Sequence, residues 1–201
     1  MRREVSYDEV FDAQEQFRII MDAMARPGKI HRLPQLDILP PEGLNKVSAL
    51  VGFGLLNADV SFACSDFNEN EIESYLSVNT GAYPSSIELA DYVFFTGNED
   101  ASVLQKVKMG TLSYPEQSAT LILSITSISE METEGVLKII LKGPGIENTN
   151  TVFVTGVNDK LLNEIKIINQ EFPLGVDLIL TDIDNQLICI PRSNHFIVGY
   201  K

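Results

Sequence analysis

Apolar residues recur near the start of the chain with the spacing of a helix. Residues at three- and four-position intervals form one stripe: Ala13, Phe17, Ile20, Met21 and Met24. This periodicity predicts an amphipathic helix whose stripe faces the core. The preceding SYDE, residues 6–9, has the S-x-x-E form of a capping box, so we expect the helix to begin there. Arg-Pro-Gly at 26–28 predicts its end, because proline disfavours helical backbone at the residue before it.

Further along, short apolar runs alternate with helical patterns. The expected strands are residues 29–33, 60–64, 90–96, 119–128, 136–142 and 151–155. The expected helices cover residues 44–57, start at 66 and at 100, and begin again after Asn158, which is a preferred N-cap residue. In that last helix one apolar face is formed by Leu161, Leu162, Ile165 and Ile168. Each apolar run is bounded by turn residues, which supports the division into elements.

The C-terminal stretch, residues 172–193, has the pattern of a β-hairpin. Two solid apolar runs, 176–180 and 187–190, flank the polar turn DIDN, and runs of this kind predict strands buried on both faces. Prolines bracket the unit, since proline cannot donate to a sheet ladder. Arg192 follows at the point where the core ends. Two interpretations stay open for it, namely a solvated strand-end charge or a cation that binds an anion or a partner.

These elements predict an α/β fold with a mixed sheet flanked by helices on both sides. At 201 residues the chain falls within the usual range for one domain, and no segment has the composition of a linker. We therefore expect a single domain over residues 1–201.

Composition narrows the function classes. The net charge of -13 argues against nucleic-acid binding, which needs clustered Lys and Arg, but leaves a local site for a small anion open. No run approaches the roughly 18 apolar residues of a membrane span, and the N-terminus has no apolar segment typical of a signal peptide. The chain has two cysteines, Cys64 and Cys189, both inside apolar runs. We expect core thiols rather than a disulfide, no membrane contact and a cytoplasmic location.

Common catalytic motifs are absent from the sequence: it has no G-x-x-x-x-G-K-[ST], H-E-x-x-H, G-x-S-x-G or C-x-x-C. With only His31 and His195 we expect no metal site and two structural or exposed histidines. The GFG at 52–54 interrupts a helical pattern, which argues against a phosphate loop.

Candidate ligand-binding side chains gather in a glycine- and proline-containing loop, residues 110–120. Glu116 and Thr111 can bond a polar ligand there, and Ser118 and Thr120 add hydroxyl groups; a rigid turn that leads into the next strand is the alternative. The GPG at 143–145 has the same two interpretations, an anion-binding turn or a strand end. The candidate cations for phosphate or phosphonate are Arg18, Arg26 and Arg192.

Several motifs occur in the order found in one known family. They are DAQxxFR at 12–18, AMxxPG at 23–28, GTxxxPExxATLIL at 110–123, GxGI at 143–146, and FPLGVDLIL followed by IPR at 172–192. Together they resemble the PhnH family, the H subunit of the bacterial carbon–phosphorus lyase system for phosphonate use. The resemblance extends over nearly the whole chain. Arg192 is followed here by Ser-Asn-His, where the family often has a Thr-Thr pair.

The resemblance implies a fold like the large domain of pyridoxal-phosphate-dependent transferases, without the cofactor and arranged as a homodimer. It implies a subunit of the complex that makes alkylphosphonate ribose 5-triphosphate from ATP and a phosphonate, with other subunits of that complex as partners and either a structural or a jointly catalytic role. Whether the chain itself is an enzyme stays open. The candidate ligand- or partner-binding residues carried over are Arg18, Glu116, Thr120 and Arg192.

Two further hypotheses belong to other function classes. The first is a self-sufficient homodimeric enzyme that binds a phosphonate or nucleotide through Arg18, Glu116 and Arg192. The second is a scaffold whose acidic surface docks basic partners, in which case association should weaken with salt.

Overall fold

The structure is a computed structural model that describes residues 3–65, 69–133 and 135–200. Its helices are α1 (Phe11–Ala25), α2 (Lys46–Leu55), α3 (Glu69–Thr80) and α4 (Asp159–Ile168), with short 3-10 helices η1 (Ala101–Lys106), η2 (Pro115–Gln117) and η3 (Asn169–Glu171). Its strands are β1 (His31–Arg32), β2 (Ser61–Ser65), β3 (Tyr83–Pro84), β4 (Tyr92–Thr96), β5 (Thr120–Ser124), β6 (Ser127–Ser129), β7 (Leu137–Lys142), β8 (Asn150–Thr155), β9 (Asp177–Thr181), β10 (Gln186–Ile190) and β11 (His195–Tyr200).

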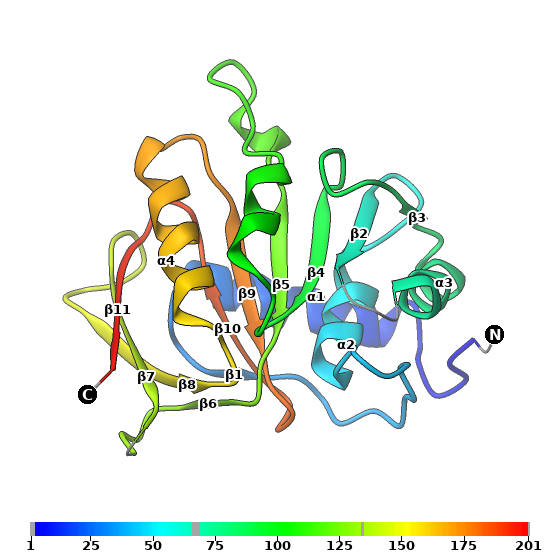
Figure 1. The fold of residues 1–201 in the computed structure, drawn as a ribbon. Helices are drawn as coiled ribbons and strands as arrows, with labels where there is room; N and C mark the ends of the chain where they lie inside the picture. The colour runs from blue at the N-terminus through cyan, green and yellow to red at the C-terminus, as the bar shows by residue number, and fades with distance from the viewer. Residues whose placement is uncertain (1–2, 66–68, 134, 201) are drawn as a thin grey trace.

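The main sheet has seven strands in the order β1-β10-β9-β5-β4-β2-β3. Strands β3, β2, β4, β5 and β9 run parallel, whereas β10 is antiparallel to both of its neighbours, β9 and β1. A second, antiparallel sheet has the order β11-β7-β8-β6. Figure 1 shows this sheet beside the main one, next to α4. The prediction of a mixed α/β fold is therefore confirmed.

The two faces of the main sheet are covered differently. One core contains apolar residues of α1, α2 and α3 packed on the sheet. The other contains residues of α4 and η1 together with β7, β8 and β11 of the second sheet. Helices thus lie on both sides as predicted, but a second sheet shares the cover on one side. The expected strand over residues 119–128 is divided between the sheets, because the chain leaves β5 at Ser124 and enters β6 at Ser127.

Helix α1 begins later than the sequence predicts, and the expected capping box does not form. Asp8 Oδ1 accepts hydrogen bonds of 2.8 Å from the backbone N–H groups of Val10 and Phe11. Ser6 instead donates to the carbonyl of Asp37, and Glu9 pairs with Arg3. An Asp side chain therefore satisfies the first free amides, which is the role that the prediction gave to Ser6.

The predicted apolar stripe of α1 is also partly wrong. Phe17 and Met21 are 47% and 52% exposed. The buried residues of the helix are Gln16, Ile20 and Ala23. The core-facing side is thus rotated toward Gln16, whose Oε1 accepts a 3.0 Å hydrogen bond from the Tyr7 hydroxyl. Because Gln16 is polar, the spacing of apolar residues alone did not identify the buried face of α1.

Two glycines let α2 pack closely. A Cβ at Gly52 would lie 3.1 Å from Leu76 of α3, and one at Gly54 would lie 3.2 Å from Gln16 of α1. Contacts this short need the neighbouring atoms to move. The GFG at 52–54 therefore serves helix packing, in agreement with the expectation that it is not a phosphate loop.

The C-terminal hairpin forms as predicted, with β9 and β10 antiparallel and Leu187 paired with Thr181. Every residue of β10 is buried. Asn185 closes the turn at φ 60°, a left-handed conformation that Asn tolerates better than most residues. Elsewhere, the predicted helix from residue 66 is described only from Glu69, and the pattern at 100–108 forms the 3-10 helix η1.

Candidate functional site

The most suitable binding crevice lies beyond the carboxyl ends of the parallel strands. The connection after β2 passes through α3 on one face, whereas the connection after β4 passes through η1 on the other. Open α/β sheets bind ligands near the point where connections diverge in this way, here between β2 and β4. Beside that point, a cavity of about 490 Å3 separates the loop at residues 40–45 from the ends of β4 and β5.

Three hydroxyl-bearing residues stand in register at this end of the sheet. Thr96 of β4 pairs with Ser124 of β5, which pairs with Thr181 of β9. Because in-register residues of parallel strands face the same side, the three side chains form one row. Thr96 and Ser124 line the crevice, while Thr181 lies below it and is fully buried.

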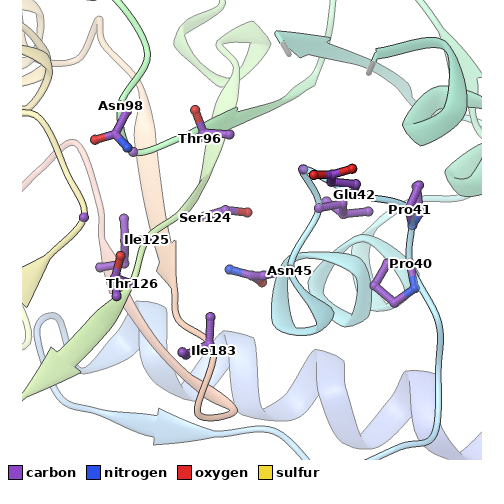
Figure 2. Close-up of a pocket in the computed structure, with 14 residues that line it drawn as sticks. Pro40, Pro41, Glu42, Asn45, Thr96, Asn98, Ser124, Ile125, Thr126 and Ile183 are labelled. Carbon is purple, nitrogen blue, oxygen red and sulfur yellow. The ribbon is translucent and has the colours of Figure 1, made fainter. Parts of the chain in front are cut away.

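The N-terminus of α2 is held against this row. Ser48 Oγ lies 2.8 Å from Ser124 Oγ and 2.6 Å from Thr181 Oγ1. Asn45, the N-cap, accepts from the backbone N–H of Ser48 and donates from Nδ2 to the carbonyl of Thr181 at 3.1 Å. Figure 2 shows Asn45 and Ser124 pointing toward one another across the crevice. This hydrogen-bonded contact fixes the position of the crevice wall before any ligand binds.

Three polar side chains of the lining, including Thr96 of the hydroxyl row, are available to a ligand. Within the described residues, the side chains of Thr96, Asn98 and Thr126 make no hydrogen bond. Of the described residues that line the crevice, Glu42 is the charged one, and neither Lys nor Arg is among them. This described lining is therefore polar and carries no positive charge.

Arg192 lies at the opposite, amino end of the parallel strands. Its Nη2 and Nε donate to both carboxylate oxygens of Asp177 at 2.5 and 3.2 Å, and its Nη1 donates to the carbonyl of Pro115 at 2.8 Å. The side chain is only 15% exposed. The solvated-charge interpretation is therefore wrong. Arg192 joins the hairpin to the loop at residues 110–118, and its guanidinium already has a carboxylate partner.

The other candidates from the sequence are only partly brought together. Thr120, the first residue of β5, pairs with Asp177 in the sheet, so it lies beside Arg192. Glu116 follows Pro115 on the same loop and is exposed. Arg18 lies on α1 and lines a hollow formed by α1 residues alone. Three of the four candidates thus share the amino end of the sheet, and Arg18 is separate from them.

A second ion pair braces the same loop region. Asp91 precedes β4, and its Oδ1 lies 2.5 Å from Lys108 Nζ, while its Oδ2 accepts from the backbone and hydroxyl of Ser61 at 2.8 Å. Burial opposes ionisation of this carboxyl, but Lys108 and Ser61 outweigh it and lower the pKa of Asp91.

This lowered pKa gives an expected pH dependence. A carboxyl with a lowered pKa in the folded state stabilises the fold at neutral pH, and the stabilisation is lost as pH falls through that pKa. We expect Asp91→Asn to lower the free energy of unfolding at pH 7. The difference from the unsubstituted chain should shrink below about pH 4, near the ordinary pKa of Asp. Urea titrations at pH 7 and below pH 4 measure the difference in unfolding free energy between the two proteins. An equal difference at both pH values would contradict this role for the carboxylate.

The histidines and cysteines lie outside the crevice. His31 contacts the carbonyl of Lys29 and Asp22, and His195 is exposed on β11. Both cysteines are buried and outside any disulfide. In the described part of the chain, no group of three His, Cys, Asp or Glu side chains is arranged to hold a metal ion. No described helix is long and apolar enough to span a membrane.

Burial raises the pKa of the Cys189 thiol, and the nearby Asp177 carboxylate raises it further. Because the thiolate is the reactive form, we expect Cys189 to resist alkylation in the folded protein. Mass spectrometry after iodoacetamide treatment should find modification of Cys189 only once denaturant is present. Rapid labelling without denaturant would show that this part of the sheet opens.

Comparison with known proteins identifies the family. A family model described as "Bacterial phosphonate metabolism protein (PhnH)" matches residues 6–196. The chain belongs to the PhnH family. A Rhizobium meliloti (strain 1021) protein named "Alpha-D-ribose 1-methylphosphonate 5-triphosphate synthase subunit PhnH" is 30% identical over 188 residues, 92% of this chain and 90% of the relative. A Stutzerimonas stutzeri protein named "Putative C-P lyase subunit protein HtxG" is 28% identical over 182 residues, 90% and 84% of the two chains.

The crevice residues of this PhnH-family chain were missed by the sequence analysis. Thr96 ends a predicted strand, but Ser124 falls inside the expected strand 119–128 and Asn45 inside the expected helix 44–57, and none of the three belongs to a recognised motif. The signal that points to them is positional, since side chains just after parallel strands share one edge of the sheet. Using that signal requires the strand order, which the sequence did not provide.

Proposed function

We propose that this chain is a subunit of a complex that makes alkylphosphonate ribose 5-triphosphate from ATP and a phosphonate. The observation that carries the proposal is the match to the family and to a named synthase subunit across nearly the full length of both chains. Full-length similarity supports a shared role better than a local motif does, because the whole surface available to partners is related.

The chemistry of the crevice supports a contribution by binding rather than by covalent catalysis. A nucleophilic hydroxyl needs an adjacent general base. The hydrogen-bond partner of the Ser124 hydroxyl is the Ser48 hydroxyl, and neither histidine lines the cavity. The proposal therefore assigns bond breaking to sister subunits, and to this chain the positioning of a reactant or of those subunits.

Co-purification tests this assignment. A tagged copy of the chain, expressed with the other phosphonate-utilisation subunits, should retain them through affinity and size-exclusion steps. A control variant altered at an exposed residue outside the crevice and outside the Arg192 region, such as Thr151→Val, should retain the sister subunits equally. Elution of the tagged chain without any of the sister subunits would contradict the proposal.

Several finer features remain part of the proposal. They are a single domain over residues 1–201, a cytoplasmic location, a fold like the large domain of pyridoxal-phosphate-dependent transferases without the cofactor, and ligand or partner binding by Arg18, Glu116, Thr120 and Arg192. The seven-stranded mixed sheet with helices on both faces is compatible with that fold. For Arg192, the pairing with Asp177 favours a role in shaping a partner surface over direct anion binding.

The homodimer is also proposed, and α1 offers a surface for it. Phe11, Phe17 and Met21 are 74%, 47% and 52% exposed on this helix. The hollow beside Phe11 is lined by both Glu15 and Arg18. Such a face can complement itself, because a two-fold axis can pair Arg18 of each copy with Glu15 of the other.

We therefore expect Phe17→Glu to weaken the dimer, since it places a carboxylate in an apolar contact. Light scattering over a concentration series should show a shift toward monomer. Leu39→Glu, which changes an even more exposed apolar residue outside α1, should leave the mass unchanged. An unchanged dimer in the Phe17→Glu variant would exclude α1 as the interface.

A further inference from the structure

We infer that the crevice at the carboxyl ends of β4 and β5 binds an uncharged, hydroxyl-bearing group of pentose size, namely the ribosyl part of a nucleoside, and leaves phosphorus-bearing groups outside. The choice of a ribosyl group rests on the proposed function. The exclusion of anions rests on the lining itself.

Proteins bind phosphate and phosphonate with Arg or Lys side chains or with free amides of a helix N-terminus. Among the residues that the structure describes, neither an Arg nor a Lys lines the crevice, and Glu42 adds a negative charge at its edge. The N-terminus of α2 is close, but its first-turn residues Lys46 and Val47 are not part of the lining.

The same lining is suited to sugar hydroxyl groups. A sugar hydroxyl both donates and accepts, so it pairs well with hydroxyl and amide side chains. Thr96, Asn98 and Thr126 provide these groups without a competing hydrogen bond in the described residues. Ser124 is already oriented by Ser48. Preorganised polar groups of this kind lower the cost of ordering the site when a ligand binds.

Closely packed backbone forms part of the crevice wall. A Cβ at Gly97 would lie 2.0 Å from the carbonyl oxygen of Gly156, so no larger residue fits there. Both glycines line the cavity. The volume of about 490 Å3 falls in the range of small-molecule sites, about 300–1,000 Å3.

The rim of the crevice has apolar side chains against which the flat face of a nucleobase can pack. Ile183, at the tip of the β9–β10 hairpin, is 67% exposed and lines the cavity together with Pro40 and Pro41. Figure 2 places Ile183 and the two prolines on either side of Asn45. A nucleobase packed against these side chains would leave its ribose near the hydroxyl row and its 5′ substituent free to point outward.

Nuclear magnetic resonance of the full chain tests this inference with three probes: adenosine, inorganic phosphate and methylphosphonate. Adenosine should shift the backbone resonances of Gly97, Asn98 and Thr126, and should bind at least about tenfold more tightly than either anion, a difference of about 1.4 kcal/mol. Glu42→Lys should raise the affinity for phosphate, since it replaces a negative charge by a positive one at the rim.

Thr96→Val is the variant that tests the hydroxyl row, because it removes one hydroxyl and keeps the side-chain shape. It should weaken adenosine binding by about five- to tenfold, as expected for one lost hydrogen bond. Thr151→Val, at an exposed position on β8, is the matched control and should leave the affinity unchanged.

Three results would overturn the inference: crevice shifts that are larger with methylphosphonate or phosphate than with adenosine, no shift with millimolar adenosine, or full affinity in the Thr96→Val variant. Co-purification with sister subunits is a separate readout. A chain that co-purifies but gives one of these results keeps its proposed function and loses only the nucleoside site.

Discussion

Replacing Arg192 by alanine is expected to lower the free energy of unfolding by about 3 kcal/mol, because breaking a buried ion pair leaves its partner charge without compensation. Asp177 would lose two hydrogen bonds from the guanidinium, and the carbonyl of Pro115 would lose its donor. The value lies at the low end of the range for buried pairs since Asp177 retains the 2.8 Å bond from the backbone N–H of residue 192 and both side chains are partly exposed.

Urea unfolding monitored by circular dichroism measures this loss. Lys160→Ala is the control, because Lys160 is an exposed cation on α4 and surface substitutions usually change stability by less than about 0.5 kcal/mol. A double-mutant cycle with Asp177→Ala separates the pair from the individual side chains. Equal stability of the Arg192→Ala and Lys160→Ala variants would show that Arg192 does not brace the loop at residues 110–118.

Replacing Asp182 by alanine is expected to cost about as much, roughly 3 kcal/mol, because several buried donors would lose their acceptor together. Asp182 is fully buried at the end of β9. Its Oδ1 accepts from the backbone N–H groups of Asp184 and Gln186 at 2.8 and 2.9 Å. Its Oδ2 accepts from the backbone N–H of Ile128 and from Gln186 Nε2 at 3.1 and 2.9 Å.

The same carboxylate therefore holds the hairpin turn and attaches β6 of the second sheet. Asp184→Ala provides the control, since that side chain is exposed in the same turn. Asp182→Asn should give an intermediate loss, because an amide NH2 would face two N–H donors. Thermal unfolding by calorimetry compares the three variants. A loss below about 1 kcal/mol for Asp182→Ala, the size of one ordinary hydrogen bond, would contradict this role.

The sequence predicted the C-terminal hairpin well and the first helix less well, and the difference has a physical cause. The hairpin combines solid apolar runs with a turn whose residues tolerate left-handed backbone, so local signals agree with the final packing. In α1 the core face contains Gln16, and the exposed face contains Phe17 and Met21. Hydrophobicity alone then predicts the wrong side, because the exposed apolar residues are ones we propose to be covered by a second copy.

Two strands of the second sheet were predicted, but the sheet itself was not. Residues 137–142 and 150–155 form strands close to the predicted bounds. The pairing of β7 with β11, a strand missed at the C-terminus, depends on contacts between residues far apart in the sequence. Local periodicity does not specify such partners, and tertiary context decides them.

The sequence pointed to candidate residues at the amino ends of the parallel strands of the main sheet, but not to those at the carboxyl ends. The family motifs pointed to Arg192, Glu116 and Thr120, and the structure places these at the amino ends of the parallel strands. The crevice at the carboxyl ends has no motif. Its polar residues come from segments more than 130 positions apart, as the hydrogen bond between Asn45 and Thr181 illustrates. Only the fold brings them to one place.

The most direct test of the proposed function is synthesis by the assembled complex. The sister subunits would be incubated with ATP and methylphosphonate, with and without this chain, and the products followed by phosphorus nuclear magnetic resonance. We expect methylphosphonate ribose triphosphate to form only when this chain is present. Equal product formation by the sister subunits alone would contradict the claim that this chain is a required part of the synthase.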